Sequence, residues 1–196
     1  MVNYTLKEKI LKFLIENKEP HSIKGIATKL NTDYKNTFQA IKDLEKLNLI
    51  SKTKIGNINL IKIKLFPNKE IISLEYKRTK EFLSKNLKIK LVKKYIDELN
   101  YPFLISLVFG SYAKATKIKS SDIDICIILD NKEKSKELHN KLNLLSLKLE
   151  IQEFTTKEFI SMIEKKENNL GNEIVKNNIL LYGIENYYNL IEKWMN

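Results

Sequence analysis

The feature that most constrains the fold is a pair of apolar runs in the second half of the chain. Residues 103–109 read FLISLVF and residues 123–129 read IDICIIL, and both have the β-branched or aromatic content of buried strands. The first run leads directly into Gly110, while Asp122 and Asp124 flank the start of the second. The two runs therefore predict two buried strands, with polar residues where the first ends and the second begins.

The two aspartates have a spacing that favours metal binding. Residues two apart on a strand point to the same face, so Asp122 and Asp124 would lie about 7 Å apart at the backbone. Two like charges placed in this way become favourable around a divalent cation, and oxygen-only ligands suit Mg²⁺ or Mn²⁺. Gly110 and Ser111 form a bend whose N–H groups and hydroxyl can face an anion. The pattern predicts a metal site beside a phosphate site; the alternative is a strand start with ordinary exposed acids.

These residues also carry a resemblance to a known family. Phe109-Gly110-Ser111, followed ten residues later by Asp122-Ile123-Asp124-Ile125, resembles the signature of nucleotidyltransferases of the DNA polymerase beta superfamily. Within it, Ser111-Tyr112-Ala113 and Ser120-Ser121-Asp122 resemble the minimal nucleotidyltransferase branch. The resemblance implies an α/β (α+β) domain over residues 101–196, with a short mixed sheet flanked by helices.

The same resemblance implies the chemistry of the site. Asp122 and Asp124 would hold Mg²⁺ (or Mn²⁺), while Gly110, Ser111 and Lys114 would bind a nucleoside triphosphate, with ATP as the first expectation. The product would be a nucleoside monophosphate group attached to a hydroxyl of a protein or a small molecule.

Family members use a third carboxylate on a later strand. The segment 149–154, LEIQEF, is the predicted strand, and it follows a predicted helix at about 132–147. Residues 155–159 resemble the Thr-x-x-Glu-Phe helix start that follows this strand in the minimal branch. Glu150 best matches the third catalytic and metal-binding position. Glu153 is the alternative, and it would face the opposite side of the strand.

The chain departs from the family pattern at three positions. Lys114 and Ala115 stand where the family commonly has arginine and glycine, and Glu150 stands in place of an aspartate. Two functions therefore stay open at this point. One is a nucleotidyltransferase; the other is a DNA-binding transcriptional regulator whose nucleotidyltransferase-like domain binds nucleotide without turnover.

The first third of the chain has a different organisation. Apolar residues at helical spacing predict three short helices, with Ser22 and Thr32 as the caps of the second and third. Residues 50–55 and 58–65 flank Gly56-Asn57 and predict a hairpin. This order resembles a winged helix-turn-helix domain over about residues 4–66, and we assign residues 1–66 to it.

The winged-helix resemblance implies DNA binding; the alternative is a protein–protein or dimerisation module. The third helix, which places Tyr34, Phe38, Ile41, Leu44 and Leu47 at steps of three or four, would enter the major groove. The predicted DNA-binding residues, on this helix and on the hairpin, are Lys35, Asn36, Gln39, Lys52, Lys54, Lys62 and Lys64.

The charge distribution agrees with a polyanion on the first half. The net charge of +11 divides into +7 over residues 1–66, +4 over residues 67–100 and zero over residues 101–196. Residues 67–100 predict two helices, at 71–83 and 87–99, that join the halves rigidly. Arg78, the only arginine, lies on the first of these helices among lysines that could extend the basic surface or simply be exposed residues of a connector helix, which is the commoner case.

Other features place the chain in a reducing compartment. No uncharged stretch is long enough to span a bilayer, no signal peptide is visible, and Cys126 has no partner cysteine, so a cytoplasmic location is expected. After Glu158 the pattern predicts only helices. Their aromatic residues, Tyr187, Tyr188 and Trp194 among them, would pack on the sheet or form a homodimer surface.

Overall fold

The structure is a computed structural model that describes residues 2–118, 121–165 and 167–195. Ser120, which belongs to the sequence resemblance, lies outside the described residues, and so does the side chain of Trp194. None of the helices within the described ranges has the length and apolar content needed to cross a bilayer.

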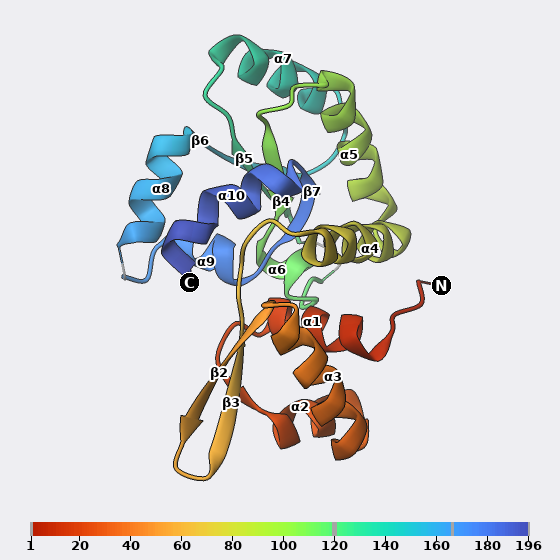
Figure 1. The fold of residues 1–196 in the computed structure, drawn as a ribbon. Helices are drawn as coiled ribbons and strands as arrows, with labels where there is room; N and C mark the ends of the chain where they lie inside the picture. Colours follow the sequence, from red (N-terminus) through yellow and green to blue (C-terminus); the bar gives the residue numbers. More distant parts are fainter. Residues whose placement is uncertain (1, 119–120, 166, 196) are drawn as a thin grey trace.

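The N-terminal part consists of three helices and a small sheet (Figure 1). The helices are α1 (Leu6–Glu16), α2 (Ile23–Leu30) and α3 (Tyr34–Lys46), and the strands are β1 (His21–Ser22), β2 (Ile50–Ile55) and β3 (Ile58–Ile63). The sheet has the order β1-β3-β2, and both pairings are antiparallel. Figure 1 shows the β2–β3 hairpin extending beside α3 and away from the rest of the molecule.

Three sequence expectations for this part are corrected. Asp33, not Thr32, caps α3, because the Asp33 carboxylate accepts the N–H of Asn36 while the Thr32 hydroxyl shares a 2.9 Å hydrogen bond with Thr37. β3 ends at Ile63, before residue 65. The buried face of α3 is made by Thr37, Ala40, Ile41 and Leu44; Tyr34 and Leu47, predicted on this face, are 55% and 51% exposed at the helix ends.

Two helices, α4 (Lys69–Lys85) and α5 (Leu87–Leu99), join the two halves. Asn68 caps α4, and Asn100 ends α5 in the left-handed conformation. Arg78 of α4 is only 4% exposed, so it does not extend the basic surface.

The second half is built on a mixed four-stranded sheet with the order β6-β5-β4-β7. Its strands are β4 (Ile105–Val108), β5 (Ile123–Ile128), β6 (Leu149–Phe154) and β7 (Ile179–Tyr182), and only the β5–β6 pair is parallel. The helices of this half are α6 (Gly110–Ala113), α7 (Lys132–Asn143), α8 (Thr156–Glu164), α9 (Leu170–Lys176) and α10 (Ile184–Met195).

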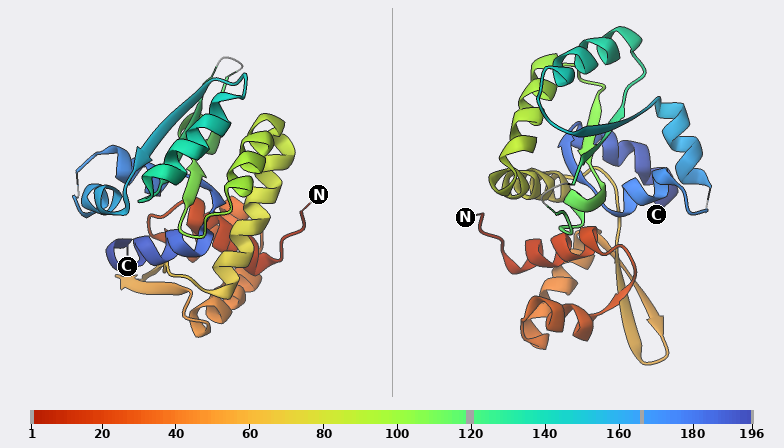
Figure 2. Two further views of the ribbon diagram at one scale, coloured as in Figure 1. Left: turned by 90° about the horizontal axis from the view of Figure 1, so that it is seen from above. Right: turned by 180° about the vertical axis from the view of Figure 1, so that it is seen from behind.

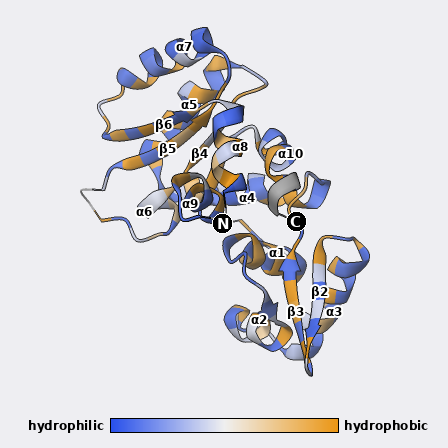
Figure 3. Cartoon of the chain, turned by 90° about the vertical axis from the view of Figure 1, so that its left-hand side faces the viewer, coloured by the Kyte–Doolittle hydropathy of each residue, from blue (hydrophilic) through white to orange (hydrophobic). Residues whose placement is uncertain are grey.

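The sheet is covered by helices on both faces (Figure 2). On one face α5 and α7 pack against Ile123, Ile125 and Ile127 of β5. On the other face α8, α9 and α10 pack with Cys126 and Ile128 in a second cluster. Because β5 is buried on both faces, its sequence is almost continuously apolar, and Figure 3 shows β4 and β5 as mainly hydrophobic and α7 as mainly hydrophilic.

The sequence prediction was wrong in three places in this half. Residues 179–182, predicted as helical, form β7, because a four-residue apolar run cannot be distinguished from a helix segment by periodicity. Phe103, predicted within the first buried strand, is 72% exposed, and α7 ends at Asn143 instead of residue 147.

A continuous hydrophobic cluster joins the N-terminal helices to the second half. It contains Ile10 and Leu14 of α1, Leu74 of α4, and Tyr188 of α10 together with residues of the four-stranded sheet. Lys18 also donates to the Lys176 carbonyl oxygen at 3.2 Å. The N-terminal helices are therefore packed on the sheet domain through shared core residues.

Candidate active site

The two strands β5 and β6 bring acidic side chains onto one face of the sheet. Asp124 and Glu150 are register partners in this parallel pair, so they stand opposite each other on adjacent strands. Asp122 lies one residue before β5, close enough for its charge to act on Asp124. Asp124 is half-buried, whereas Asp122 and Glu150 are exposed. The sheet thus presents three carboxylates at an edge that solvent reaches.

The Gly110 turn closes over this acidic group from β4. Gly110 has φ +62°, a left-handed conformation that favours glycine, and an added Cβ would lie 2.0 Å from Oδ2 of Asp124. The Phe109 N–H donates to the Asp124 carbonyl oxygen at 3.1 Å, which fixes the turn against β5. The turn and the Asp124 carboxylate are therefore in direct contact.

The pKa of the Asp124 carboxyl is raised above its usual value. Partial burial is the largest cause, and the neighbouring charge of Glu150 is the next, with Asp122 adding to it. The Ser111 N–H donates to the Asp124 carboxylate and acts in the opposite direction. The three carboxylates repel one another, and a bound cation would remove this repulsion.

Glu153, the sequence alternative to Glu150, is turned to the other face of β6. Its carboxylate accepts hydrogen bonds from the Ser135 hydroxyl at 2.7 Å and pairs with His139 Nε2 at 2.6 Å, both on α7. Glu150 is exposed, and its Oε1 accepts a 3.3 Å hydrogen bond from Gln152 Nε2 on the same strand. Of the two glutamates, only Glu150 faces the aspartates.

Lys114 lies beside the turn but is directed to α9. Its Nζ forms a 2.7 Å ion pair with Glu173 Oε1, and both side chains are partly exposed. A cavity of about 680 Å³, lined by Lys114, Asn172 and Glu173 among others, adjoins this pair. No sequence spacing linked Lys114 to Glu173, because the two residues are 59 positions apart.

The donor set fits Mg²⁺ in its chemistry, because all three side chains offer only oxygen. Within residues 2–118, 121–165 and 167–195, no three His, Cys, Asp or Glu side chains form a ready-made metal cage. Magnesium sites in nucleotide enzymes are completed by substrate phosphates and water, and need only one or two carboxylates from the protein. The residues present are therefore compatible with a metal that enters together with its nucleotide.

Comparison with known protein families identifies the family to which this chain belongs. Residues 77–187 match the family described as Polymerase beta, Nucleotidyltransferase, and this match covers more than half of the 196 residues. The chain therefore belongs to this family of nucleotidyltransferases. The searches of curated proteins and of solved structures return no match. The matched range begins inside α4 and contains every acidic residue of the site.

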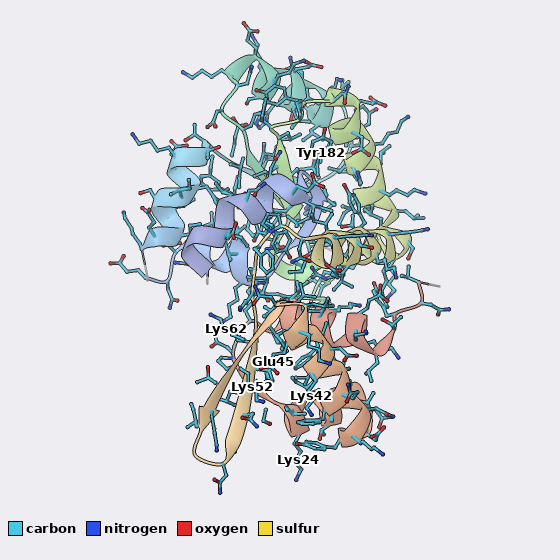
Figure 4. All side chains as sticks on the ribbon, in the orientation of Figure 1. Lys24, Lys42, Glu45, Lys52, Lys62 and Tyr182 are labelled. Carbon is cyan, nitrogen blue, oxygen red and sulfur yellow. The ribbon has the colours of Figure 1, made fainter. Side chains whose placement is uncertain are left out.

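The predicted DNA-binding residues lie on α3 and the hairpin, outside the matched range. Figure 4 shows Lys52 and Lys62 on the hairpin and Lys42 on α3. Lys35, Asn36 and Gln39 are exposed on α3, but Asn36 donates to the Asp33 carboxylate and Gln39 donates to Asp43 Oδ1 at 3.2 Å. Lys54 is exposed near the tip of the hairpin, while Lys64 donates to Asn48 Oδ1 at its base.

The sequence did not predict the contacts between lysines and aromatic rings near both surfaces. The exposed Tyr34 ring stacks on the half-buried Phe38 ring with centroids 6.1 Å apart, and Lys42 lies over the Phe38 ring. Next to the Gly110 turn, Lys117 Nζ lies 4.4 Å from the Tyr112 ring centroid. The helical spacing predicted both rings on the core face; Phe38 does pack against the core, whereas Tyr34 is exposed.

Proposed function

We propose that this protein is a metal-dependent nucleotidyltransferase that moves a nucleoside monophosphate group from a nucleoside triphosphate to a hydroxyl acceptor. The observation that carries the proposal is the register of β5 and β6, which sets Asp124 opposite Glu150 and beside the Gly110 turn. Family membership supports the reaction class. ATP with Mg²⁺ is the first combination to test.

Each residue of the site has a role in this proposal. Asp122, Asp124 and Glu150 would hold the Mg²⁺, which supplies charge neutralisation for attack on a polyanion. Gly110 and Ser111 seat the phosphates at the turn, and Lys114 binds them after leaving Glu173. Glu150 accepts the acceptor hydroxyl proton. The acceptor oxygen then forms a bond with the α-phosphorus as the bond from the α-phosphorus to its bridging oxygen breaks, and pyrophosphate leaves.

We further propose that the N-terminal part is a winged helix that binds DNA. The three helices followed by a hairpin support this assignment, and so does the excess of seven positive charges over residues 1–66. α3 would enter the major groove with Lys35, Asn36 and Gln39, and Lys52, Lys54, Lys62 and Lys64 would follow the phosphate backbone. The hydrogen bonds from Asn36 and Gln39 to Asp33 and Asp43 would have to be exchanged for base contacts.

The nucleotide part is tested by calorimetric titration of each nucleoside triphosphate with Mg²⁺, with pyrophosphate release followed in the same samples. We expect wild type to bind and to release pyrophosphate, and the Asp122→Asn/Asp124→Asn variant to lose both. Binding without release would support the second candidate, the nucleotide-binding regulator. The departures from the family pattern at Lys114, Ala115 and Glu150 favour that candidate, because they alter the site without removing the aspartates.

The DNA part is tested by titration of duplex DNA at two salt concentrations. Removing two phosphate contacts with Lys52→Gln/Lys54→Gln should lower the slope of log affinity against log salt by about 1.8, from about 0.9 per contact. A slope and affinity equal to those of wild type would contradict the assignment of the hairpin to the DNA backbone.

A further inference from the structure

The tip of the β2–β3 hairpin exposes two isoleucines. Ile55 and Ile58 face each other across the turn Gly56-Asn57, and they are 61% and 56% exposed. Among the residues that the structure describes, neither belongs to a hydrophobic cluster, whereas Ile61 and Ile63, nearer the base of the hairpin, are buried in one. The tip isoleucines therefore lie outside the core, and core packing does not account for them.

The turn holds the two isoleucine side chains next to each other. Gly56 has φ +57°, and a glycine of positive φ at the first position of a two-residue turn suits the right-handed twist of a hairpin. Ile55 and Ile58 are register partners, so their side chains leave the same face of the hairpin. Thr53 and Leu60 form the next pair on this face. The hairpin therefore ends in a preformed apolar tip.

Lysines lie on both faces of the hairpin behind this tip. Lys52 and Lys54 are exposed on the face opposite to the isoleucines, while Lys62 lies on the isoleucine face, across from Ser51. Figure 4 shows Lys52 and Lys62 along the hairpin. Residues 50–64 contain no acidic residue. The two strands of a polyanion could therefore meet lysines on the two faces, with the apolar tip between them.

The groove next to α3 is the one within reach of the tip in the proposed DNA complex. In that complex α3 occupies the major groove, and Figure 1 shows the hairpin extending beside α3. The minor groove of straight B-DNA is about 6 Å wide. Paired strands lie about 4.8 Å apart before their side chains are counted, so a hairpin with side chains on both faces does not fit this groove. The tip can enter it where the DNA is distorted.

We infer that Ile55 and Ile58 act as an apolar wedge that enters the minor groove at a base step and bends the DNA. Apolar side chains inserted at a step partly unstack the base pairs and bend the duplex by about 20–90° toward the major groove. This bend opens the minor groove for the hairpin, and the lysines on the two faces contact phosphates of the two strands. The inference rests on the proposed DNA binding and adds that the protein distorts the DNA it binds.

A wedge of this kind selects DNA without contacting base edges. Pyrimidine–purine steps such as TA unstack easily, whereas A-tracts are stiff and have a narrow minor groove. The cost of the bend is therefore lower on a duplex with TA steps than on an A-tract of the same composition. The ligand of the wedge is thus duplex DNA that contains flexible pyrimidine–purine steps.

The test measures bending and affinity on two duplexes of about 24 base pairs that have the same base composition. One duplex carries a central run of TA steps and the other a central A-tract, and both carry a fluorophore at each end. Energy transfer between the fluorophores at saturating protein reports the bend. Wild type is compared with Ile55→Val/Ile58→Val and Ile55→Thr/Ile58→Thr. Valine and threonine have the same shape and both favour strands, so these matched variants differ in apolar character alone.

We expect wild type and the valine variant to raise energy transfer on the TA duplex and to bind it about tenfold more tightly than the A-tract duplex. The threonine variant should lose the rise in energy transfer and bind the two duplexes within about twofold of each other. Its slope of log affinity against log salt should equal that of wild type, because every lysine remains. Equal bending by the valine and threonine variants would overturn the wedge.

The wedge and the proposed DNA binding fail in different ways. A wild-type protein that binds duplex DNA with a steep salt dependence and leaves energy transfer unchanged would overturn the wedge but not the DNA binding. Equal bending and affinity on the TA and A-tract duplexes would overturn the preference for flexible steps. A wild-type protein that binds neither duplex at low salt would refute the DNA binding and the wedge together.

Discussion

Gly110 is the residue whose replacement most directly probes the site. Its position has two separate requirements: a left-handed backbone at φ +62° and space beside the Asp124 carboxylate. The sequence indicated a turn at Gly110-Ser111 and a neighbouring acidic pair, but it did not indicate that the turn and Asp124 are in contact. That contact depends on how β4 and β5 pair, with Val108 opposite Ile125, and a strand register of this kind is not visible in local sequence.

The first prediction separates these two requirements at Gly110. We expect Gly110→Ala to displace the Asp124 side chain, and therefore to weaken nucleotide binding at least about tenfold and lower stability by roughly 2 kcal/mol. Gly56→Ala is the matched control, because Gly56 has φ +57° and no atom within 4 Å of an added Cβ. It should lose only about 1 kcal/mol and keep nucleotide binding. Equal nucleotide affinity in Gly110→Ala and wild type, measured by calorimetry, would contradict the role of the turn.

The second prediction concerns Ala115, where the family commonly has glycine. Ala115 has φ +55°, so its Cβ opposes a left-handed backbone. We expect Ala115→Gly to raise the free energy of unfolding by about 0.5–1 kcal/mol in urea titrations, because the strain is removed. Ala113→Gly in the adjacent α6 should lower stability instead, since no left-handed residue is relieved there. A loss of stability in both variants would show that the left-handed conformation at Ala115 is not strained.

At the scale of elements, β6 shows how one strand serves two surfaces. Glu150 faces Asp124, and Glu153 faces Ser135 and His139 on α7. The alternation of a strand, applied to LEIQEF, placed these glutamates on opposite faces from sequence alone. The sequence could not predict what each would meet, because the partners come from β5 and α7. The same limit explains β7: its four residues become a strand only because β4 pairs with them.

The third prediction concerns the pair formed by α6 and α9. Glu173 pairs with Lys114, so in the proposed function a bound phosphate would have to replace Glu173. We expect Lys114→Ala to weaken nucleoside triphosphate binding about tenfold, and Glu173→Gln to leave it unchanged or tighter, because the lysine is then free for the phosphate. Calorimetric titration of ATP with Mg²⁺ measures both. Weaker binding in Glu173→Gln would indicate that the ion pair itself positions the site.

The fourth prediction is a pH dependence set by α1 and α4. Lys12, then Lys85 and Tyr4, lower the pKa of Glu81 to about 2, below its value of about 4.3 in the unfolded chain. A group with a lowered folded pKa stabilises the fold above its unfolded pKa, and this contribution is lost as the pH falls from about 5 toward 2. Wild type should therefore lose about 1–2 kcal/mol more than Glu81→Gln between pH 7 and pH 3, as measured by urea unfolding.

The exposed Glu19 supplies the control for this measurement. Glu19→Gln should keep the pH dependence of wild type, because no described cation holds its carboxylate. Identical pH profiles for wild type and Glu81→Gln would show that Lys12 and Glu81 do not stabilise the junction of α1 and α4.

At the scale of the whole molecule, Arg78 joins the two halves. Its guanidinium donates to Glu75 at 2.6 Å, to Glu16 of α1 at 3.4 Å and to the Asn178 carbonyl at 3.3 Å. Tyr188 of α10 donates to the same Glu75 at 2.6 Å. The sequence identified Arg78 as the only arginine, but its surrounding lysines made it appear part of a basic surface. Burial in a network from three parts of the chain cannot be read from neighbouring residues.

The fifth prediction follows from that network. Arg78→Met leaves the Glu75 carboxylate buried without its partner, so we expect a loss of about 3–5 kcal/mol. Tyr188→Phe should cost about 1–2 kcal/mol, since it removes one hydrogen bond to a charged group. Lys80→Met, on the exposed side of the same helix, should stay within about 0.5 kcal/mol of wild type.

Because the hydrophobic cluster spans both halves, urea unfolding of wild type should show one transition; two separate transitions would contradict the shared core.

The central claim is that the face of β6 carrying Glu150 belongs to a nucleotidyl transfer site. The most direct measurement is pyrophosphate release by Glu150→Gln and Glu153→Gln, compared with wild type in ATP and Mg²⁺. Both variants make the same change on the same strand, and only the face differs. We predict that Glu150→Gln loses at least about a hundredfold in rate, while Glu153→Gln stays within a few-fold of wild type. Equal rates in Glu150→Gln and wild type, or loss only in Glu153→Gln, would contradict the account.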